Sequence, residues 1–459
     1  MPAPPRPPAL PAPAVAPVSA ETRLAYVLQH FRQVYEDVPD VTIGYADAQP
    51  AITVLDEAGD FFQQTDPYPP APNRREWAGL MVPFFFDPRP AAPLLELTDG
   101  RAVIQADVIA AAFYLLSGWQ EYFSDARDHH GRFPYAASVQ QQYGFVALPA
   151  VNYYFDVLKT AVEHVTGRPL RLRRWRAGAA FAAFISHDVD NMRSAWKAPA
   201  KAALYRGQLL QFGQLLWQHL TRPDAWDNLE AVAAATAKYE ARSTFFILPE
   251  RRLGADGTPN ADYGITASLL KRLAALKEQG CEISLHGSIG TATDAPHLAR
   301  EAECLQPAAA GLRFHYLRWE PRLTPAAVDA ANRFPYDSTL GFAEHFGFRN
   351  SYCRPFYPYN FASGAAHDFL EIPLNVMDAT LHHPNYLQLR PEEIIPALQP
   401  ILVEVERFGG VATVLWHNEN FDPANTTNGP REFDKLLTVL RWRGAAFLTG
   451  REIHQQFPT

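Results

Sequence analysis

The run Phe181-Ala-Ala-Phe-Ile-Ser-His-Asp-Val-Asp190 changes abruptly from apolar residues to a histidine and two acids. An unbroken apolar run of this kind is typical of a strand buried on both faces of a parallel sheet. Chemistry in α/β proteins lies at the carboxyl ends of such strands. We therefore expect Asp188 and Asp190 to share one small site, where one carboxylate holds a cation and the other accepts a proton. The alternatives are that Asp190 only caps the next helix and that His187 is an ordinary core histidine.

From residue 179 onward, predicted strands and helices alternate strictly. Strands are predicted at 179–187, 243–248, 281–286, 312–317, 336–340, 371–377, 411–417 and 445–449. The clearest helices are 266–279, 324–333, 391–408 and 430–443. Seven or eight such units predict an α/β fold with a distorted (β/α) barrel. The apolar helical piece from Leu209 to Leu220 is expected to pack on the barrel exterior, with a lid over the site as the alternative.

The part of the chain before the barrel has a different pattern. Eight prolines in the first twenty residues predict a disordered tail over 1–19, which resembles neither a signal peptide nor a membrane anchor. Residues 20–175 mix helical and strand patterns and are expected to form a smaller α/β domain, followed by the barrel over 176–459. The loop Asp128-His-His-Gly-Arg-Phe-Pro134 is expected to be a structural turn, with a metal or ligand loop as the alternative.

Composition excludes several classes of protein. The 459 residues are 47% hydrophobic and 20% charged, which suits ordinary globular cores. A net charge of −8 argues against nucleic-acid binding. Three scattered cysteines fit a reducing compartment, and no apolar run is long enough to span a bilayer. We therefore expect a cytoplasmic location and no transmembrane segment.

Polar residues recur at the predicted carboxyl ends of the barrel strands. They are Asp188, Asp190, His286, Arg313, His315, Asp378, His417 and Asn418. A set of aspartates and histidines without thiols suits a divalent cation such as zinc in an open catalytic site. The shared position at one rim favours a functional site, although each residue alone has an ordinary structural explanation.

Five short motifs carry a family resemblance. They are Ser186-His-Asp-Val-Asp190, Ser243-Thr-Phe-Phe246, Leu285-His-Gly-Ser288, Gly311-Leu-Arg-Phe-His-Tyr316 and Leu415-Trp-His-Asn418. Together they resemble the polysaccharide deacetylase superfamily, carbohydrate esterase family four, whose shared unit is the NodB homology domain. The resemblance covers roughly 178 to 455. Leu116-Ser117, Glu121-Tyr122 and Asp128 to Phe133 resemble a subgroup with an accessory amino-terminal domain.

The resemblance implies a role for each matched residue. It implies Asp188 as general base, Asp190 and His286 as metal ligands, Arg313 as the support of the catalytic aspartate, Asp378 as the acid that orients the catalytic histidine, and His417 as general acid. The main chain near Tyr316 would support an oxyanion. Tyr316 and Trp416 are also expected to bind the substrate by stacking on a sugar.

One position departs from the family pattern. The second histidine of the family's metal motif should fall at Gly290, which has no side chain to bind a metal. Three possibilities stay open: His315 supplies the ligand from the neighbouring strand end, water completes the shell, or the metal site is weak or absent. A catalytic zinc normally has three protein ligands.

The resemblance implies a metal-dependent hydrolase that removes N-acetyl groups from a saccharide. The missing export signal favours an intracellular saccharide, or a lipid- or nucleotide-linked sugar, as substrate. One alternative is a catalytically inactive glycan-binding protein, favoured by Gly290. The other is a hydrolase of cyclic amides, because some relatives of this superfamily have that activity.

Overall fold

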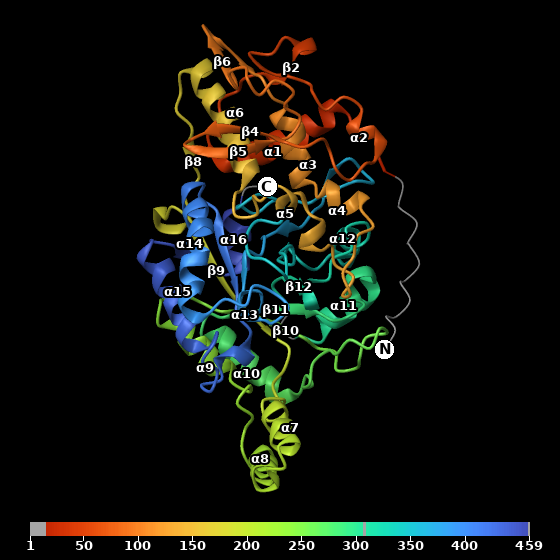
Figure 1. Ribbon diagram of the computed structural model, residues 1–459, viewed down its shortest axis with the longest axis vertical. Coiled ribbons are helices and arrows are strands. Elements are labelled where there is room, and N and C mark those ends of the chain that lie inside the picture. Colours follow the sequence, from red (N-terminus) through yellow and green to blue (C-terminus); the bar gives the residue numbers. More distant parts are fainter. Residues whose placement is uncertain (1–14, 306–308, 458–459) are drawn as a thin grey trace.

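Figure 1 shows the computed structural model of the chain, whose described residues are 15–305 and 309–457. Residues 1–14 of the predicted disordered tail lie outside this range. We call residues 15–175 the amino-terminal module and residues 176–457 the barrel. In Figure 1 the amino-terminal module, coloured red to yellow, lies above the barrel, coloured green to blue.

The amino-terminal module is a small mixed sheet covered by helices. The sheet has the order β2-β3-β7-β6, with β2, β3 and β7 parallel and β6 antiparallel to β7. Its strands are β2 (Ile43–Tyr45), β3 (Ile52–Val54), β6 (Leu95–Thr98) and β7 (Arg101–Ile104). A separate hairpin joins β4 (Asn73–Trp77) to β5 (Leu80–Phe84), and β1 (Tyr35–Glu36) pairs with β8 (Arg171–Leu172). The helices are α1 (Ala20–Val34), α2 (Phe61–Gln64), α3 (Val108–Leu116), α4 (Trp119–Phe123), α5 (Val139–Gln142) and α6 (Ala150–Thr166).

Local sequence explains where these helices begin and end. The Ser19 hydroxyl accepts a hydrogen bond from the Thr22 backbone N–H at 3.2 Å, which caps the first turn of α1. The Asp107 side chain does the same for α3 through the Ala110 N–H at 2.9 Å. Gly167 ends α6 with a φ of +64°, a conformation that costs glycine little.

The barrel is a curled parallel sheet that carries the candidate site. Its strand order is β16-β13-β12-β11-β10-β9-β18-β17, and β19 pairs with the first residues of β9. The strands are β9 (Ala182–Val189), β10 (Thr244–Ile247), β11 (Glu282–Gly287), β12 (Leu312–Phe314), β13 (Tyr336–Asp337), β16 (Leu370–Glu371), β17 (Val376–Met377), β18 (Val411–Leu415) and β19 (Ala446–Phe447). All eight residues of β9 are buried, as its apolar run predicts. The predicted distorted (β/α) barrel is confirmed as a curled parallel half-barrel.

Helices cover the outside of this sheet. They are α9 (Leu229–Ala237), α10 (Ala267–Glu278), α11 (Ala295–Glu303), α12 (Thr324–Ala331), α13 (Asp378–His382), α14 (Pro391–Arg407), α15 (Pro430–Trp442) and α16 (Gly450–Gln456). The pair α7 (Lys197–Tyr205) and α8 (Leu209–Thr221) is different, because it projects from the barrel as a helical hairpin (Figure 1). The expectation that Leu209 to Leu220 packs on the barrel exterior is wrong, since α8 has no buried residue.

Two predicted strands are interrupted. The strand expected over 312–317 ends at Phe314, and His315–Leu317 form a 3-10 turn in which Tyr316 and Leu317 have φ values of +58° and +54°. The strand expected over 371–377 is two short strands, β16 and β17, separated by the segment around Leu374, whose N–H bonds to the Leu340 carbonyl. The first interruption lies at the carboxyl end of β12, next to His315.

The two modules share one core. A single cluster of buried apolar residues includes members of both, such as Phe113 of α3 and Tyr359 of the barrel, whose rings lie 4.8 Å apart. Across the junction, Arg349 Nη2 lies 2.6 Å from Glu121 Oε2, and both side chains are almost fully buried. The Tyr26 hydroxyl of α1 donates to the Tyr357 carbonyl at 2.8 Å. The amino-terminal module is therefore packed firmly on one side of the barrel.

Candidate active site

The predicted site residues come together at the carboxyl rim of the barrel. Parallel pairing sets His286 of β11 directly beside Arg313 of β12, and Asp188 of β9 beside Phe246 of β10. Because parallel strands end at the same edge of a sheet, their terminal polar side chains meet there. The segments after β9, β12 and β18 bring in Asp190, His315 and His417, respectively.

Three of these residues form a compact ligand triangle. His286 Nε2 lies 3.4 Å from Asp190 Oδ1, His315 Nδ1 lies 3.4 Å from the same oxygen, and the two nitrogens are 3.2 Å apart. A tetrahedral zinc with ligand bonds of 2.0–2.1 Å needs ligand atoms about 3.3 Å from one another. The three edges agree with this value, so the triangle fits one face of a tetrahedral metal site.

Hydrogen bonds orient both histidines of the triangle in a way that suits metal binding. His286 Nδ1 lies 2.9 Å from the Arg313 carbonyl, and His315 Nε2 lies 3.2 Å from the Pro259 carbonyl. Each of these nitrogens must carry a proton to donate to a carbonyl, and in the neutral ring the other nitrogen then has a lone pair. Those lone pairs are on His286 Nε2 and His315 Nδ1, the two atoms of the triangle. Carbonyl partners of this kind are typical of metal-binding histidines.

The electrostatics of the triangle also suit a cation. Asp190 Oδ1 is buried and has no hydrogen-bond partner among the described residues, although polar atoms in such places normally have one. Burial would raise the pKa of Asp190, but His315, His286 and His417 hold it below its usual range. Burial lowers the pKa of His315 to about 4, which keeps its ring neutral at neutral pH. A carboxylate and a neutral imidazole are the forms that bind a metal.

Asp188 lies next to the triangle and is held by Arg313. Arg313 Nη1 donates to Asp188 Oδ1 at 2.9 Å, and Asp188 Oδ2 lies 3.6 Å from His286 Nε2. Arg313 is itself fully buried, with Nε donating to the Ser338 carbonyl at 2.8 Å and its guanidinium 4.3 Å from the centre of the Phe246 ring. The fixed guanidinium orients Asp188 and leaves the second oxygen of this carboxylate, Oδ2, on the side of His286.

His417 and Asp378 form a hydrogen-bonded pair at the same rim. His417 Nδ1 lies 2.7 Å from Asp378 Oδ1, while His417 Nε2 faces the site, 3.8 Å from Asp190 Oδ2. Burial alone would lower the pKa of His417, but the carboxylates of Asp378, Asp190 and Asp188 raise it to about 10. With this pKa, His417 carries a proton at neutral pH, and its Nε2 faces Asp190.

The turn after β12 is held by the amino-terminal module. Arg132 Nη1 donates to the Tyr316 carbonyl at 3.0 Å, and the His130 ring stacks on the Tyr316 ring with centroids 4.6 Å apart. Asp128 fixes this loop by pairing with Arg132 at 2.7 Å and accepting the His130 N–H. The Asp128–Pro134 loop is thus more than a turn on the surface, because it contacts the rim of the candidate site.

One expected detail does not hold. Trp416 cannot stack on a sugar, because its side chain is fully buried, lies against Phe433 and donates to the Asn428 carbonyl. Alternation along the strand explains the error: His417 faces the rim and the residue before it faces the interior. Gly290 has a φ of +100°, so a histidine there would be strained in this loop conformation.

Other polar residues of the site were not singled out from the sequence. Asn420 Nδ2 donates to Asp378 Oδ2 at 2.6 Å, and Glu419, whose pKa burial and Asp190 raise to about 7, accepts from Asn191. Both follow His417 closely, so the polar run Asn418-Glu419-Asn420 was a usable signal. Arg132 belongs to the loop Asp128–Pro134 that the sequence singled out, but no local pattern predicts its contact with Tyr316, 184 positions away.

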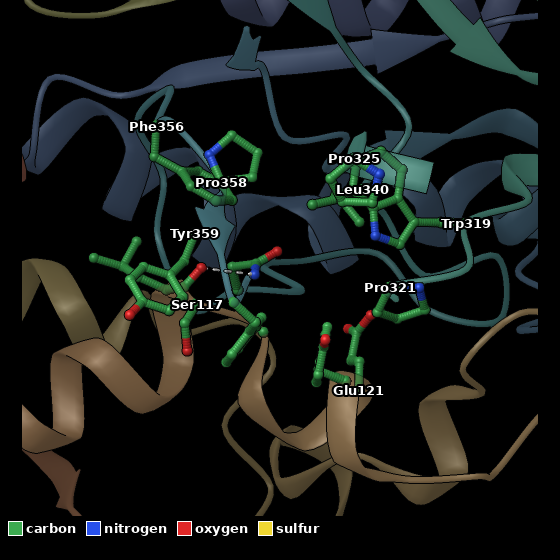
Figure 2. A pocket seen from close by; sticks show the side chains of 14 residues that line it. Ser117, Glu121, Trp319, Pro321, Pro325, Leu340, Phe356, Pro358 and Tyr359 are labelled. Atoms are coloured by element: carbon green, nitrogen blue, oxygen red, sulfur yellow. Dashed lines mark hydrogen bonds between the residues drawn. The ribbon is translucent and has the colours of Figure 1, made fainter. Parts of the chain in front are cut away.

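A separate pocket lies at the junction of the modules (Figure 2). It is a small cavity of about 30 Å³ between α4 and the loops after β12 and β13, with Glu121, Trp319 and Tyr359 in its wall. Ser117 Oγ, Asn350 Oδ1 and the Tyr359 hydroxyl line it and are buried without a hydrogen-bond partner among the described residues. Such atoms are ordinary places for buried water. The ligand triangle does not line this pocket.

In residues 15–305 and 309–457, none of the helices combines the length and the apolar character that crossing a bilayer requires.

Comparisons with known sequences match only the first part of the chain. Residues 18–167 match a family of unknown function, DUF7033. No curated protein matches the chain.

Solved structures give weak similarities over about 60% of the chain. A candidate polysaccharide deacetylase from Mycobacterium smegmatis has 14% identity and a TM-score of 0.41, covering 62% of this chain and 92% of that one. Puue allantoinase has 12% identity and a TM-score of 0.39 over 61% and 91%. The catalytic domain of a peptidoglycan N-acetylglucosamine deacetylase from Eubacterium rectale has 11% identity and a TM-score of 0.31 over 60% and 90%. At these values we base no conclusion on them, although the structural neighbours include polysaccharide deacetylases, the family that the motifs resemble.

Proposed function

We propose that this protein is a metal-dependent hydrolase that removes N-acetyl groups from a saccharide. The observation that carries the proposal is the ligand triangle of Asp190, His286 and His315, with a carboxylate on one side and a protonated histidine on the other. The triangle supports His315 as the third ligand, in place of the histidine that the family pattern has at the position of Gly290. For this reason we favour the enzyme over an inactive glycan-binding protein.

The residues present fit zinc. One carboxylate oxygen and two imidazole nitrogens are a donor set of catalytic zinc sites, which keep a further position open. When bound, the metal would polarise the amide carbonyl and lower the pKa of a water molecule in the site. The family resemblance supports the same assignment, since it implies Asp190 and His286 as ligands.

The remaining side chains would move the protons. Asp188 would accept a proton from the attacking water at Oδ2, the oxygen that Arg313 leaves free. His417 would donate the proton on Nε2 to the departing amine nitrogen, since its Nδ1 is held by Asp378. The main chain after His315, held in place by Arg132, would lie near the carbonyl oxygen of the substrate.

We also propose that the amino-terminal module acts as an accessory domain over residues 20–175, with the catalytic barrel over 176–459. Support comes from the Arg132 and His130 contacts, which bring this module to the rim of the candidate site. Tyr316, half-buried beneath His130, is the aromatic residue that we expect to contact the substrate.

The test is metal content together with acetate release from N-acetylglucosamine oligomers. The wild-type protein should bind about one zinc and release acetate, and both Asp188→Asn and His417→Ala should lower the rate by a hundredfold or more, about the size of a lost acid or base. His297→Ala is the matched control, because this histidine pairs with Glu301 on α11 outside the site. A folded wild-type protein that neither binds metal nor releases acetate would contradict the proposal, as would full activity in either variant.

A further inference from the structure

The α7–α8 hairpin has little contact with the rest of the molecule. It leaves the barrel directly after β9 and extends away from it at the bottom of Figure 1. Only Ala200 and Ala203 of α7 are buried, and no residue of α8 is. Inside the hairpin, the rings of Trp196 and His219 stack with centroids 4.5 Å apart. The hairpin is thus a formed element with a free outer surface.

The outer surface of α8 is apolar. Its exposed residues Leu209, Leu210, Leu216, Trp217 and Leu220 fall within an arc of about 120° when placed on a helix of 3.6 residues per turn. Leu210 is 94% exposed, Leu220 73% and Trp217 59%. Tyr205, at the end of α7, is exposed beside them. Clustered apolar residues of this size on a soluble surface mark a place of contact with something else.

The charge of the hairpin contrasts with that of the chain. Between Asn191 and Pro223 the bases are Arg193, Lys197, Lys201, Arg206 and Arg222, and this stretch contains no aspartate or glutamate. The whole protein has a net charge of −8. A second copy of this acidic protein or a nucleic acid could pair with the positive charge of the hairpin. Neither partner requires a row of exposed leucines beside that charge. Apolar residues flanked by bases are the pattern of a helix that lies in the interface of an anionic membrane.

We propose that the α7–α8 hairpin docks this protein on the surface of an anionic phospholipid membrane. The apolar face of α8 inserts among the headgroups, and the flanking lysines and arginines contact lipid phosphates. With 13 residues, α8 is about 20 Å long, too short to cross a hydrocarbon core of about 30 Å. The helix therefore lies along the surface.

The base of the hairpin connects this surface to the candidate site. Asn418 Nδ2 donates to the carbonyls of Asn191 and Trp226, at 2.9 and 2.8 Å, which are the two ends of the hairpin excursion. Asn418 directly follows His417 in the chain. A docked hairpin would thus hold the rim of the barrel at a set distance from the membrane. The inference goes beyond the proposed hydrolase function and does not depend on it.

Co-sedimentation with vesicles tests the proposal. The full-length protein should sediment with phosphatidylcholine vesicles that contain about 30% phosphatidylglycerol, much less with phosphatidylcholine alone, and less as salt is added. The double variant Leu210→Ser with Leu220→Ser should bind at least about tenfold more weakly, because two apolar side chains no longer insert. The triple variant Lys197→Gln, Lys201→Gln, Arg206→Gln should lose the preference for anionic vesicles.

Matched controls come from the rest of the surface. Trp442→Ser removes an aromatic side chain that is 83% exposed on α15, and Arg168→Gln, Arg171→Gln, Arg174→Gln removes three exposed bases. Both should bind vesicles like the wild type, and circular dichroism should show every variant folded. The proposal is overturned if the wild type stays in the supernatant, binds neutral vesicles equally well, or binds no better than the two hairpin variants. Dissociation of a wild-type dimer by the leucine variant, without vesicle binding, would overturn it in favour of a second copy.

Discussion

At the scale of one residue, His315 concerns the third metal ligand, which the sequence left undecided. The motif resemblance gave Asp188, Asp190, His286 and His417 their expected roles, and the structure brings these four residues to one rim. The resemblance left three possibilities open for the third metal ligand, namely His315, water, or a weak or absent metal site. That choice depends on the turn after Phe314 and on which ring nitrogen faces Asp190, and neither can be obtained from residue spacing.

Replacement of His315 tests the ligand triangle directly. His315→Ala should weaken zinc binding by more than the roughly 10–100-fold typical of losing an outer-shell partner, because a direct ligand is lost. Competition with a chromogenic chelator measures the affinity. His130→Ala is the control, since His130 stacks on the other side of Tyr316 and does not belong to the triangle. Unchanged zinc affinity in His315→Ala would remove this residue from the site.

At the scale of elements, the sequence predicted the barrel strands well but not their ends. Apolar runs determine where β9, β10, β11 and β18 lie, since a buried strand needs a continuous apolar stretch. The residues His315–Leu317 continue such a run, yet two of them have positive φ values. This backbone conformation is unfavourable for tyrosine and leucine, so it requires support from outside the segment. Arg132 supplies that support from a distant part of the chain.

Removing this support should impair catalysis without unfolding the protein. Arg132→Ala leaves the Tyr316 carbonyl without its partner, and a small shift of the turn should lower kcat by about tenfold to a hundredfold, with a smaller effect on KM. Steady-state kinetics of acetate release measure this. Arg127→Ala is the matched control, because Arg127 also joins the modules, through Glu320 at 3.0 Å, but does not contact the turn. Equal losses in the two variants would argue against a positioning role for Arg132.

At the scale of the whole molecule, the sequence predicted two units but not how they join. Tyr26 and Tyr357 are 331 positions apart, and Glu121 and Arg349 are 228 apart. No local pattern links such pairs, because helix and strand periodicity report only which face of an element is buried. The shared core and its buried ion pair are features of the assembled fold.

The junction should make stability depend on pH through His30. Burial lowers the pKa of His30 to about 4, and its neutral ring bridges the Tyr26 carbonyl and the Tyr357 N–H. Between about 4 and the usual value near 6.5 the unfolded state binds the extra proton, so stability rises with pH in this window. As pH falls from about 6.5 to 4, this histidine alone should cost about 3 kcal/mol of the free energy of unfolding.

Denaturant unfolding across this pH range measures the effect. The slope of stability against pH should be smaller in His30→Gln, whose side chain does not titrate. His164→Gln, at the exposed carboxyl end of α6, should retain the wild-type slope. An unchanged slope in His30→Gln would show that protonation of His30 does not limit stability.

The long separation of Tyr26 from Tyr357 also has a consequence during synthesis. A ribosome that adds about 5–20 residues per second needs roughly 20–60 s to produce the 331 residues between them. Throughout that time α1 and α3 expose the aromatic surface that Tyr359 later covers. The nascent chain therefore presents a chaperone-binding surface long before the barrel emerges, and folding of the first third waits for the last.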